Sequence, residues 1–163
     1  MAIIKPNNNT ISAITALPAG VGGKVLQVVS TAKTNAFTTT ATSDTAVTGL
    51  SLSITPSSSS NKIFVIFTGI TSCDNAASHY GAMSIYRDST RIVGGQVAVT
   101  SGSTRFDSVN SGMSILDTPS TTSAITYQLY VKSEGNSSTV RINATSGVVI
   151  DEKAVITAYE IQG

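Results

Sequence analysis

From residue 24 onward, turn residues divide the chain into short apolar segments, and this spacing constrains the fold more than any other feature. The most apolar segment, Asn61–Ile70, follows a turn made by Pro56 and the serine run 57–60. No segment after residue 24 keeps a 3.6-residue period. We therefore predict an all-β domain over residues 24–163, an antiparallel jelly-roll sandwich of about nine or ten strands.

The expected strands can be placed by their turns and by their alternation of apolar and polar residues. Residues 105–118 fit either one long strand or a pair broken near Gly112. The full set is Lys24–Thr31, Phe37–Ala41, Val47–Ile54, Asn61–Ile70, Ala82–Asp88, Thr90–Gly94, Arg105–Thr118, Ala124–Glu134, Thr139–Asn143 and Lys153–Gln162.

Several of these strands are apolar on both faces, whereas a strand in a free sandwich needs only one apolar face. In Asn61–Ile70, for example, Ile63 and Val65 oppose Phe64 and Ile66. Without helices to cover the second face, another copy of the chain is the expected cover, and closed symmetry is the usual form of such self-association. The residues that we expect at this subunit interface are Leu26, Val28, Phe64, Ile66, Gln128, Tyr130, Ile156 and Ala158.

Residues 1–23 differ from the rest of the chain and are interpreted as an attachment arm. Asn9 or Thr10 is placed to cap a short helical turn that Pro18 would end, and three glycines before residue 24 form a hinge. A frayed tail is the alternative, but it has no use for so many apolar side chains. The arm residues expected to bind a partner surface are Ile3, Ile4, Pro6, Asn8, Asn9, Ile11, Ile14 and Leu17.

Composition narrows the range of functions. Ser and Thr make up 47 of the 163 residues and charged residues only 12%, which suits a rigid, uncharged surface. The net charge of +1, with scattered Lys and Arg, argues against binding nucleic acid. No apolar run reaches the length of a membrane span, and the N-terminus lacks the pattern of a secretory signal, so we expect no membrane partner and synthesis in a host cytoplasm.

The sequence nominates no catalytic or metal centre, and we expect neither enzymatic activity nor a cofactor. One histidine, His79, and one cysteine, Cys73, exclude a His pair or a Cys-rich metal site. Asp74, Ser78 and His79 share one loop, but neighbouring residues in a loop rarely give triad geometry. The nine acidic residues do not cluster. The loop is instead a candidate contact loop, with Asp74, His79 and Tyr80 as its contact residues.

The order of segments resembles a module of tailed-bacteriophage virion proteins. The residues that carry this resemblance are Gly23–Thr40, Val47–Ile63, Asp117–Tyr127 and Ile156–Ile161, so it covers about residues 23–163. The arrangement is also similar to the trimeric jelly rolls of the C1q and tumour-necrosis-factor type. That similarity implies that the first, third, sixth and last main strands form an inner sheet around a threefold axis.

The resemblance implies a virion protein, and the short arm favours one position in the particle. A module that makes up nearly the whole chain fits a homotrimeric capsid decoration or cement protein on the capsid surface, which binds the major capsid protein through its arms. The alternative is a receptor-binding knob of a tail or head fibre that recognises host-surface glycan. A soluble C1q-like protein from a cell is a more distant third reading.

Overall fold

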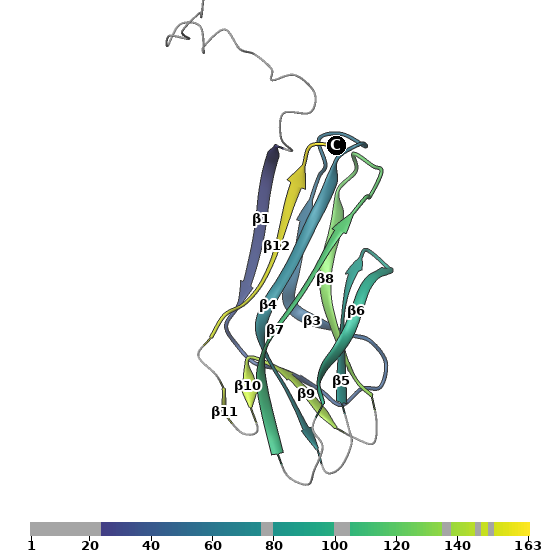
Figure 1. Ribbon diagram of the computed structural model, residues 1–163. Coiled ribbons are helices and arrows are strands. Elements are labelled where there is room, and N and C mark those ends of the chain that lie inside the picture. The colour runs from purple at the N-terminus through teal and green to yellow at the C-terminus, as the bar shows by residue number, and fades with distance from the viewer. Residues whose placement is uncertain (1–23, 76–79, 100–104, 135–137, 146–147, 150–151) are drawn as a thin grey trace, which may run out of the picture.

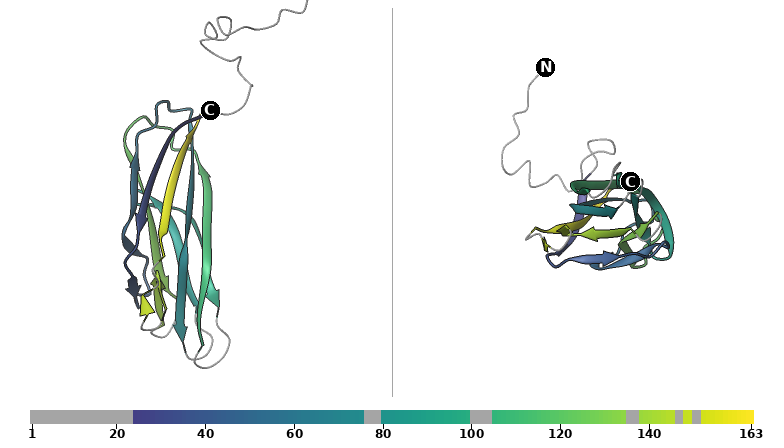
Figure 2. Two further views of the ribbon diagram at one scale, coloured as in Figure 1. Left: turned by 90° about the vertical axis from the view of Figure 1, so that its left-hand side faces the viewer. Right: turned by 90° about the horizontal axis from the view of Figure 1, so that it is seen from below.

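The computed structural model describes residues 24–75, 80–99, 105–134, 138–145, 148–149 and 152–163. These residues form two antiparallel sheets that face each other as layers, with no helix among them (Figures 1 and 2). The predicted all-β jelly-roll class is therefore confirmed. The predicted arm and its helical turn lie outside the described residues.

The larger sheet, here called sheet A, is built around the long strand β4 (Lys62–Asn75). Along one side of β4 lie β12 (Ala154–Ile161) and then β1 (Val25–Lys33), followed further along by β9 (Thr139–Ile142) and β2 (Phe37–Thr39). β7 (Arg105–Asp117) pairs with the other side of β4 over its whole length. Residues 105–117 therefore form a single strand and not a broken pair.

The second sheet, sheet B, has the order β3-β8-β5-β6. Its strands are β3 (Thr45–Ile54), β8 (Ile125–Ser133), β5 (Tyr80–Arg87) and β6 (Thr90–Val99). The expected tight turn between β5 and β6 is present, with Asp88 at a positive φ of 52°. A two-residue pair, β10 (Ala144–Thr145) and β11 (Val148–Val149), was not predicted, because so short a pair leaves no periodic pattern.

The hydrophobic core lies between the two sheets and is made by alternate residues of their strands. β4 contributes Ile63, Val65 and Phe67, and β8 contributes Tyr127 and Leu129, all of them fully buried. β12 contributes Ala154, Ile156 and Ala158, also without exposed surface. Burial of each large apolar side chain stabilises the fold by about 1.5–3 kcal/mol.

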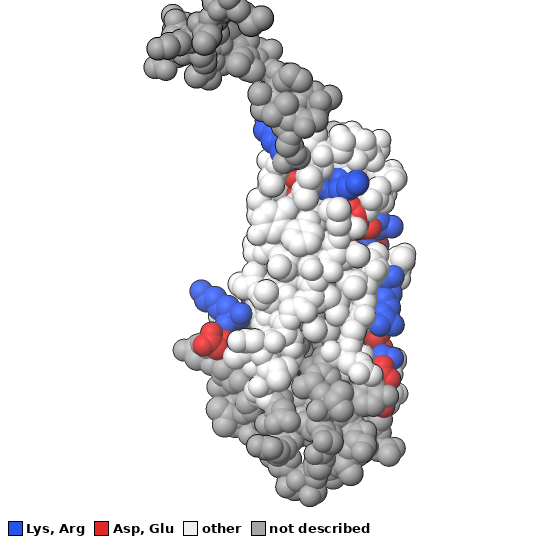
Figure 3. Space-filling view, in the orientation of Figure 1, with Lys and Arg blue, Asp and Glu red and all other residues white. Residues whose placement is uncertain are grey.

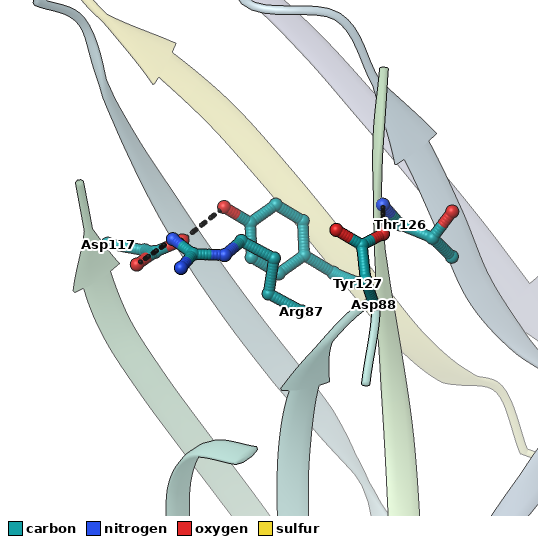
Figure 4. A network of polar contacts seen from close by, with 5 residues as sticks. All are labelled: Arg87, Asp88, Asp117, Thr126 and Tyr127. Atoms are coloured by element: carbon teal, nitrogen blue, oxygen red, sulfur yellow. Dashed lines mark hydrogen bonds and ion pairs between the residues drawn. The ribbon is translucent and has the colours of Figure 1, made fainter. Parts of the chain in front are cut away.

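A network of polar contacts between Arg87, Asp117 and Tyr127 connects the two sheets (Figure 4). Arg87 of sheet B donates through Nη1 to both carboxylate oxygens of Asp117 in sheet A, at 2.9 and 2.8 Å. The buried Tyr127 donates its hydroxyl to Asp117 Oδ2 at 2.6 Å. Burial and this hydrogen bond raise the pKa of Tyr127, so the phenol stays a donor.

A buried carboxylate fixes the end of sheet A at which residue 24 enters. Glu160 is 1% exposed, and it accepts hydrogen bonds from Gln27 Nε2 at 2.6 Å and Asn61 Nδ2 at 2.6 Å. Ser57 adds its backbone N–H at 2.6 Å and its hydroxyl at 2.7 Å. At the same end, the N–H of Gln162 donates to the carbonyl of Lys24 at 2.9 Å, so the C-terminus and the root of the arm lie side by side (Figure 2).

Candidate functional site

The outer face of sheet A, which points away from the core, carries rows of side chains that run across four neighbouring strands. The first row, given in the order β1, β12, β4 and β7, consists of Val28, Tyr159, Phe64 and Leu116. The second row, in the same order, consists of Ser30, Thr157, Ile66 and Ser114. The third row is Ala32, Val155, Thr68 and Gly112.

The first row is a continuous apolar band in the half of the sheet that lies toward residue 24. The rings of Phe64 and Tyr159 have centroids 6.2 Å apart, within the range of favourable aromatic contact. At the two ends of the band, Val28 is 54% and Leu116 49% exposed. Scattered exposed apolar residues are normal on protein surfaces, but a band that spans four strands is typical of an interaction surface.

This face also lacks formal charge in its middle. None of the residues in the three rows is ionisable near neutral pH, and Figure 3 shows the acidic and basic side chains around the rim of the face. Lys62 marks the rim beside Ile161, one row beyond the apolar band. Protein interfaces are depleted of charged residues at their centre in the same way.

Four of the predicted interface residues lie on this face, but two others do not. Leu26, Val28, Phe64 and Ile66 point outward from sheet A, where Leu26 is 38% exposed. The prediction of Ile156 and Ala158 was wrong, because both are fully buried between the sheets of a single chain. The residues of β12 that reach the outer face are Val155, Thr157, Tyr159 and Ile161.

The remaining two predicted interface residues belong to a different surface. Gln128 and Tyr130 are partly exposed on the outer face of sheet B, on the opposite side of the sandwich. They cannot share one flat contact with Val28 and Phe64. Leu116 was not predicted, because its strand is rich in Ser and Gly, although its pairing with Phe64 completes the apolar band.

The other candidate residues lie beside or within the segments outside the described residues. His79 and the arm residues 1–23 lie outside the described residues. Asp74 ends the pairing of β4 with β9, and Tyr80 begins β5, but only their backbones are described. Asp74 and Tyr80 therefore lie in strands, and not in the loop that was predicted from sequence.

Within the described part of the chain, no group of three or more His, Cys, Asp or Glu side chains is placed to hold a metal ion. No helix there is long and apolar enough to cross a membrane. Cys73 is fully buried in the hydrophobic core, on strand β4 of sheet A. The apolar band of sheet A offers the burial of apolar surface.

No protein-family model matches the sequence, and no curated protein matches it either. Among solved structures, the chain is similar to a chain of infectious bursal disease virus strain Gx, with 13% identity, a TM-score of 0.35 and coverage of 83% of this chain and 38% of that one. A mutant VP2 protein of the same virus, in derived T=1 particles, shows 13% identity, a TM-score of 0.40 and coverage of 82% and 36%. The chain thus spans little more than a third of these viral chains, and likeness at this level does not extend to function.

Proposed function

We propose that this protein is a virion structural protein, a homotrimeric capsid decoration or cement protein that binds the shell through residues 1–23. The observation that carries the proposal is the uncharged apolar band across four strands of sheet A. Leaving this band in water exposes aromatic and aliphatic side chains that a second copy of the same face would cover.

The membership of sheet A supports association around a threefold axis. If the short β2 and the β9–β11 segment are set aside, β1, β4, β7 and β12 are the first, third, sixth and last main strands. These are the strands that form the inner sheet in the trimeric jelly rolls that the sequence resembles. Three outer faces of sheet A packed about an axis would bury the apolar band, and sheet B would face outward.

The shell is proposed as the partner of the arm. The arm sequence places five large apolar residues within 17 positions, Ile3, Ile4, Ile11, Ile14 and Leu17. Each would contribute about 1.5–3 kcal/mol if buried against the major capsid protein. Three arms leaving one trimer would bind together, which strengthens attachment through effective concentration.

The proposed self-association is tested by the molecular mass of the protein in solution. Light scattering of the full chain at micromolar concentration should return three subunits. Leu116→Asp adds a charge to the apolar band and should give a folded monomer by circular dichroism. Ser53→Asp adds the same charge to the exposed outer side of sheet B and should leave the trimer intact. A wild-type monomer contradicts the proposal.

The shell-binding half is tested with the parent particle. Removing residues 1–20 should leave a folded trimer that no longer attaches to particles stripped of the protein. Full attachment of the truncated trimer would show that the arm is not the anchor. Copy number separates decoration from the alternative fibre knob, because hundreds of copies per particle fit a shell protein and tens fit a fibre.

A further inference from the structure

The outer face of sheet B carries a compact group of aromatic, hydroxyl and guanidinium side chains. Strand pairing places Tyr130, Ser84 and Gly94 in one row across β8, β5 and β6. The adjacent row consists of Gln128, Tyr86 and Arg91. These residues lie on the side of the sandwich opposite to the apolar band of sheet A.

Gly94 leaves room for the guanidinium of Arg91 beside the backbone of β6. A β-carbon built on Gly94 would be 1.8 Å from Nη2 of Arg91, so the guanidinium fills the space that a side chain would take. Cross-strand side chains in a sheet are about 5 Å apart. The guanidinium therefore lies beside Ser84, and Ser84 lies beside Tyr130, in a strip about 10 Å long.

The two tyrosines form one aromatic unit that is held by an acid. Their ring centroids are 4.2 Å apart, and the hydroxyl of Tyr86 donates to Asp44 Oδ2 at 2.6 Å. This hydrogen bond, with burial, raises the pKa of Tyr86, so the phenol remains protonated. The hydrogen bond to Asp44 therefore fixes the ring of Tyr86, and the partly exposed ring of Tyr130 packs against it.

Two polar atoms in this group have unmet hydrogen-bonding capacity. Ser84 is fully buried, and its Oγ has no hydrogen-bond partner among the described residues. The same holds for Oδ1 of Asp44. Buried polar atoms are nearly always paired, so an unpaired hydroxyl and an unpaired carboxylate oxygen in one cluster point to a missing donor or acceptor.

We propose that this strip, defined by Tyr130, Ser84 and Arg91 with Tyr86 and Asp44 behind it, binds an acidic saccharide. The apolar face of a sugar ring packs on Tyr130, and a carboxylate on the sugar forms a bidentate pair with the Arg91 guanidinium. An inorganic anion offers no apolar ring face, and a neutral sugar leaves Arg91 without its anion.

The site is independent of the proposed trimer but compatible with it. Assembly through sheet A leaves the outer face of sheet B open to solvent. From sequence, recognition of host glycan was only the alternative function, and Asp74, His79 and Tyr80 were the contact residues expected. The strip on sheet B includes none of these three residues. A virion protein with this strip would bring an acid-sugar contact to the outside of the particle.

The probes are two acidic saccharides, each compared with an uncharged relative. Titration of the full chain with 3′-sialyllactose and with trigalacturonic acid, followed by amide NMR, should shift the signals of Ser84, Gly94 and Tyr130 with at least one of the two. The uncharged counterparts, lactose and methyl-esterified trigalacturonate, should bind at least tenfold more weakly. The absence of such shifts with both acidic probes would overturn the proposal.

Variants distinguish a specific binding site from general attraction between the acidic saccharide and positive charges on the protein. Arg91→Ala should abolish the shifts, and Arg91→Lys should weaken binding because the ammonium lacks the planar fork. Gly94→Ala should also weaken binding, since it displaces the guanidinium without removing a polar group. Lys62→Ala removes one positive charge on the rim of sheet A and should change nothing. Equal losses in Arg91→Ala and Lys62→Ala would refute the site, and light scattering of the same samples reports the trimer separately.

Discussion

Glu160 is a carboxylate that the fold buries almost completely, and no described Lys or Arg forms an ion pair with it. Burial alone would raise its pKa, but hydrogen bonds from Asn61, Ser57 and Gln27 outweigh burial and lower the pKa from an ordinary 4.5 to about 2. The donors come from the start of β1 and from the β3–β4 turn. The charge of one residue therefore connects three segments that are distant in sequence.

The lowered pKa of Glu160 predicts the direction in which the stability of the fold changes with pH. A carboxyl group with a lowered pKa in the folded state stabilises that state above pH 4.5, and loses this contribution as the pH falls through about 2. This pKa shift of Glu160 corresponds to about 3 kcal/mol of stabilisation of the folded state at neutral pH. Glu160→Gln should therefore lower the free energy of unfolding by about 2–3 kcal/mol at pH 7.

Urea unfolding at fixed protein concentration, from pH 7 down to pH 2, checks this prediction. The difference between wild type and Glu160→Gln should shrink below pH 4, because the wild-type carboxyl group becomes protonated. A difference that stays constant over the whole range would mean that only the shape of the side chain matters. Glu152→Gln, at an exposed position, serves as a control for the loss of one acidic group.

At the scale of the element, β12 shows what a strand sequence leaves undecided. Both of its faces are apolar, so alternation located the strand but did not say which face meets the core. The structure buries Ala154, Ile156 and Ala158 between the two sheets, and it turns Tyr159 outward.

Three substitutions in β12 should separate the two faces of the strand. Ile156→Ala opens a cavity in the core and should lower the free energy of unfolding by about 3 kcal/mol without changing the subunit number. Thr157→Ala, on the outer face in the polar second row, should affect both properties little. Tyr159→Ser should leave the subunit folded but weaken the trimer by at least tenfold. Calorimetry and light scattering on each variant give the two readouts, and a monomeric Ile156→Ala would contradict the assignment of faces.

For the whole molecule, the sequence predicted the class of fold because turn residues and two-residue alternation are local signals. It did not predict the pairing of β7 with β4 or the polar network of Arg87, Asp117 and Tyr127. Both features depend on strands that meet only after the chain has folded. The strip on sheet B was not anticipated for the same reason. Tyr86 and Arg91 are unremarkable in sequence and become neighbours through strand register.

If three chains fold and associate together, thermal stability depends on protein concentration. Each tenfold increase adds about 1.4 kcal/mol for each of two association steps, shared by three subunits, or about 0.9 kcal/mol per subunit. For a chain of this size, the melting temperature should rise by about 2–4 °C per tenfold increase. Scanning calorimetry over a hundredfold range checks this, and Leu116→Asp should melt at one temperature throughout.

The missing charge in the middle of sheet A has a consequence for the surroundings in which such a protein can work. Dissolved salt weakens attraction between exposed ions over distances beyond about 10 Å at 0.1 M, but apolar contact has no ions to screen. A contact made through this face would hold in brine and tighten in sulfate. Because apolar attraction fades on cooling, low temperature and not high salinity is the condition under which the subunits would come apart.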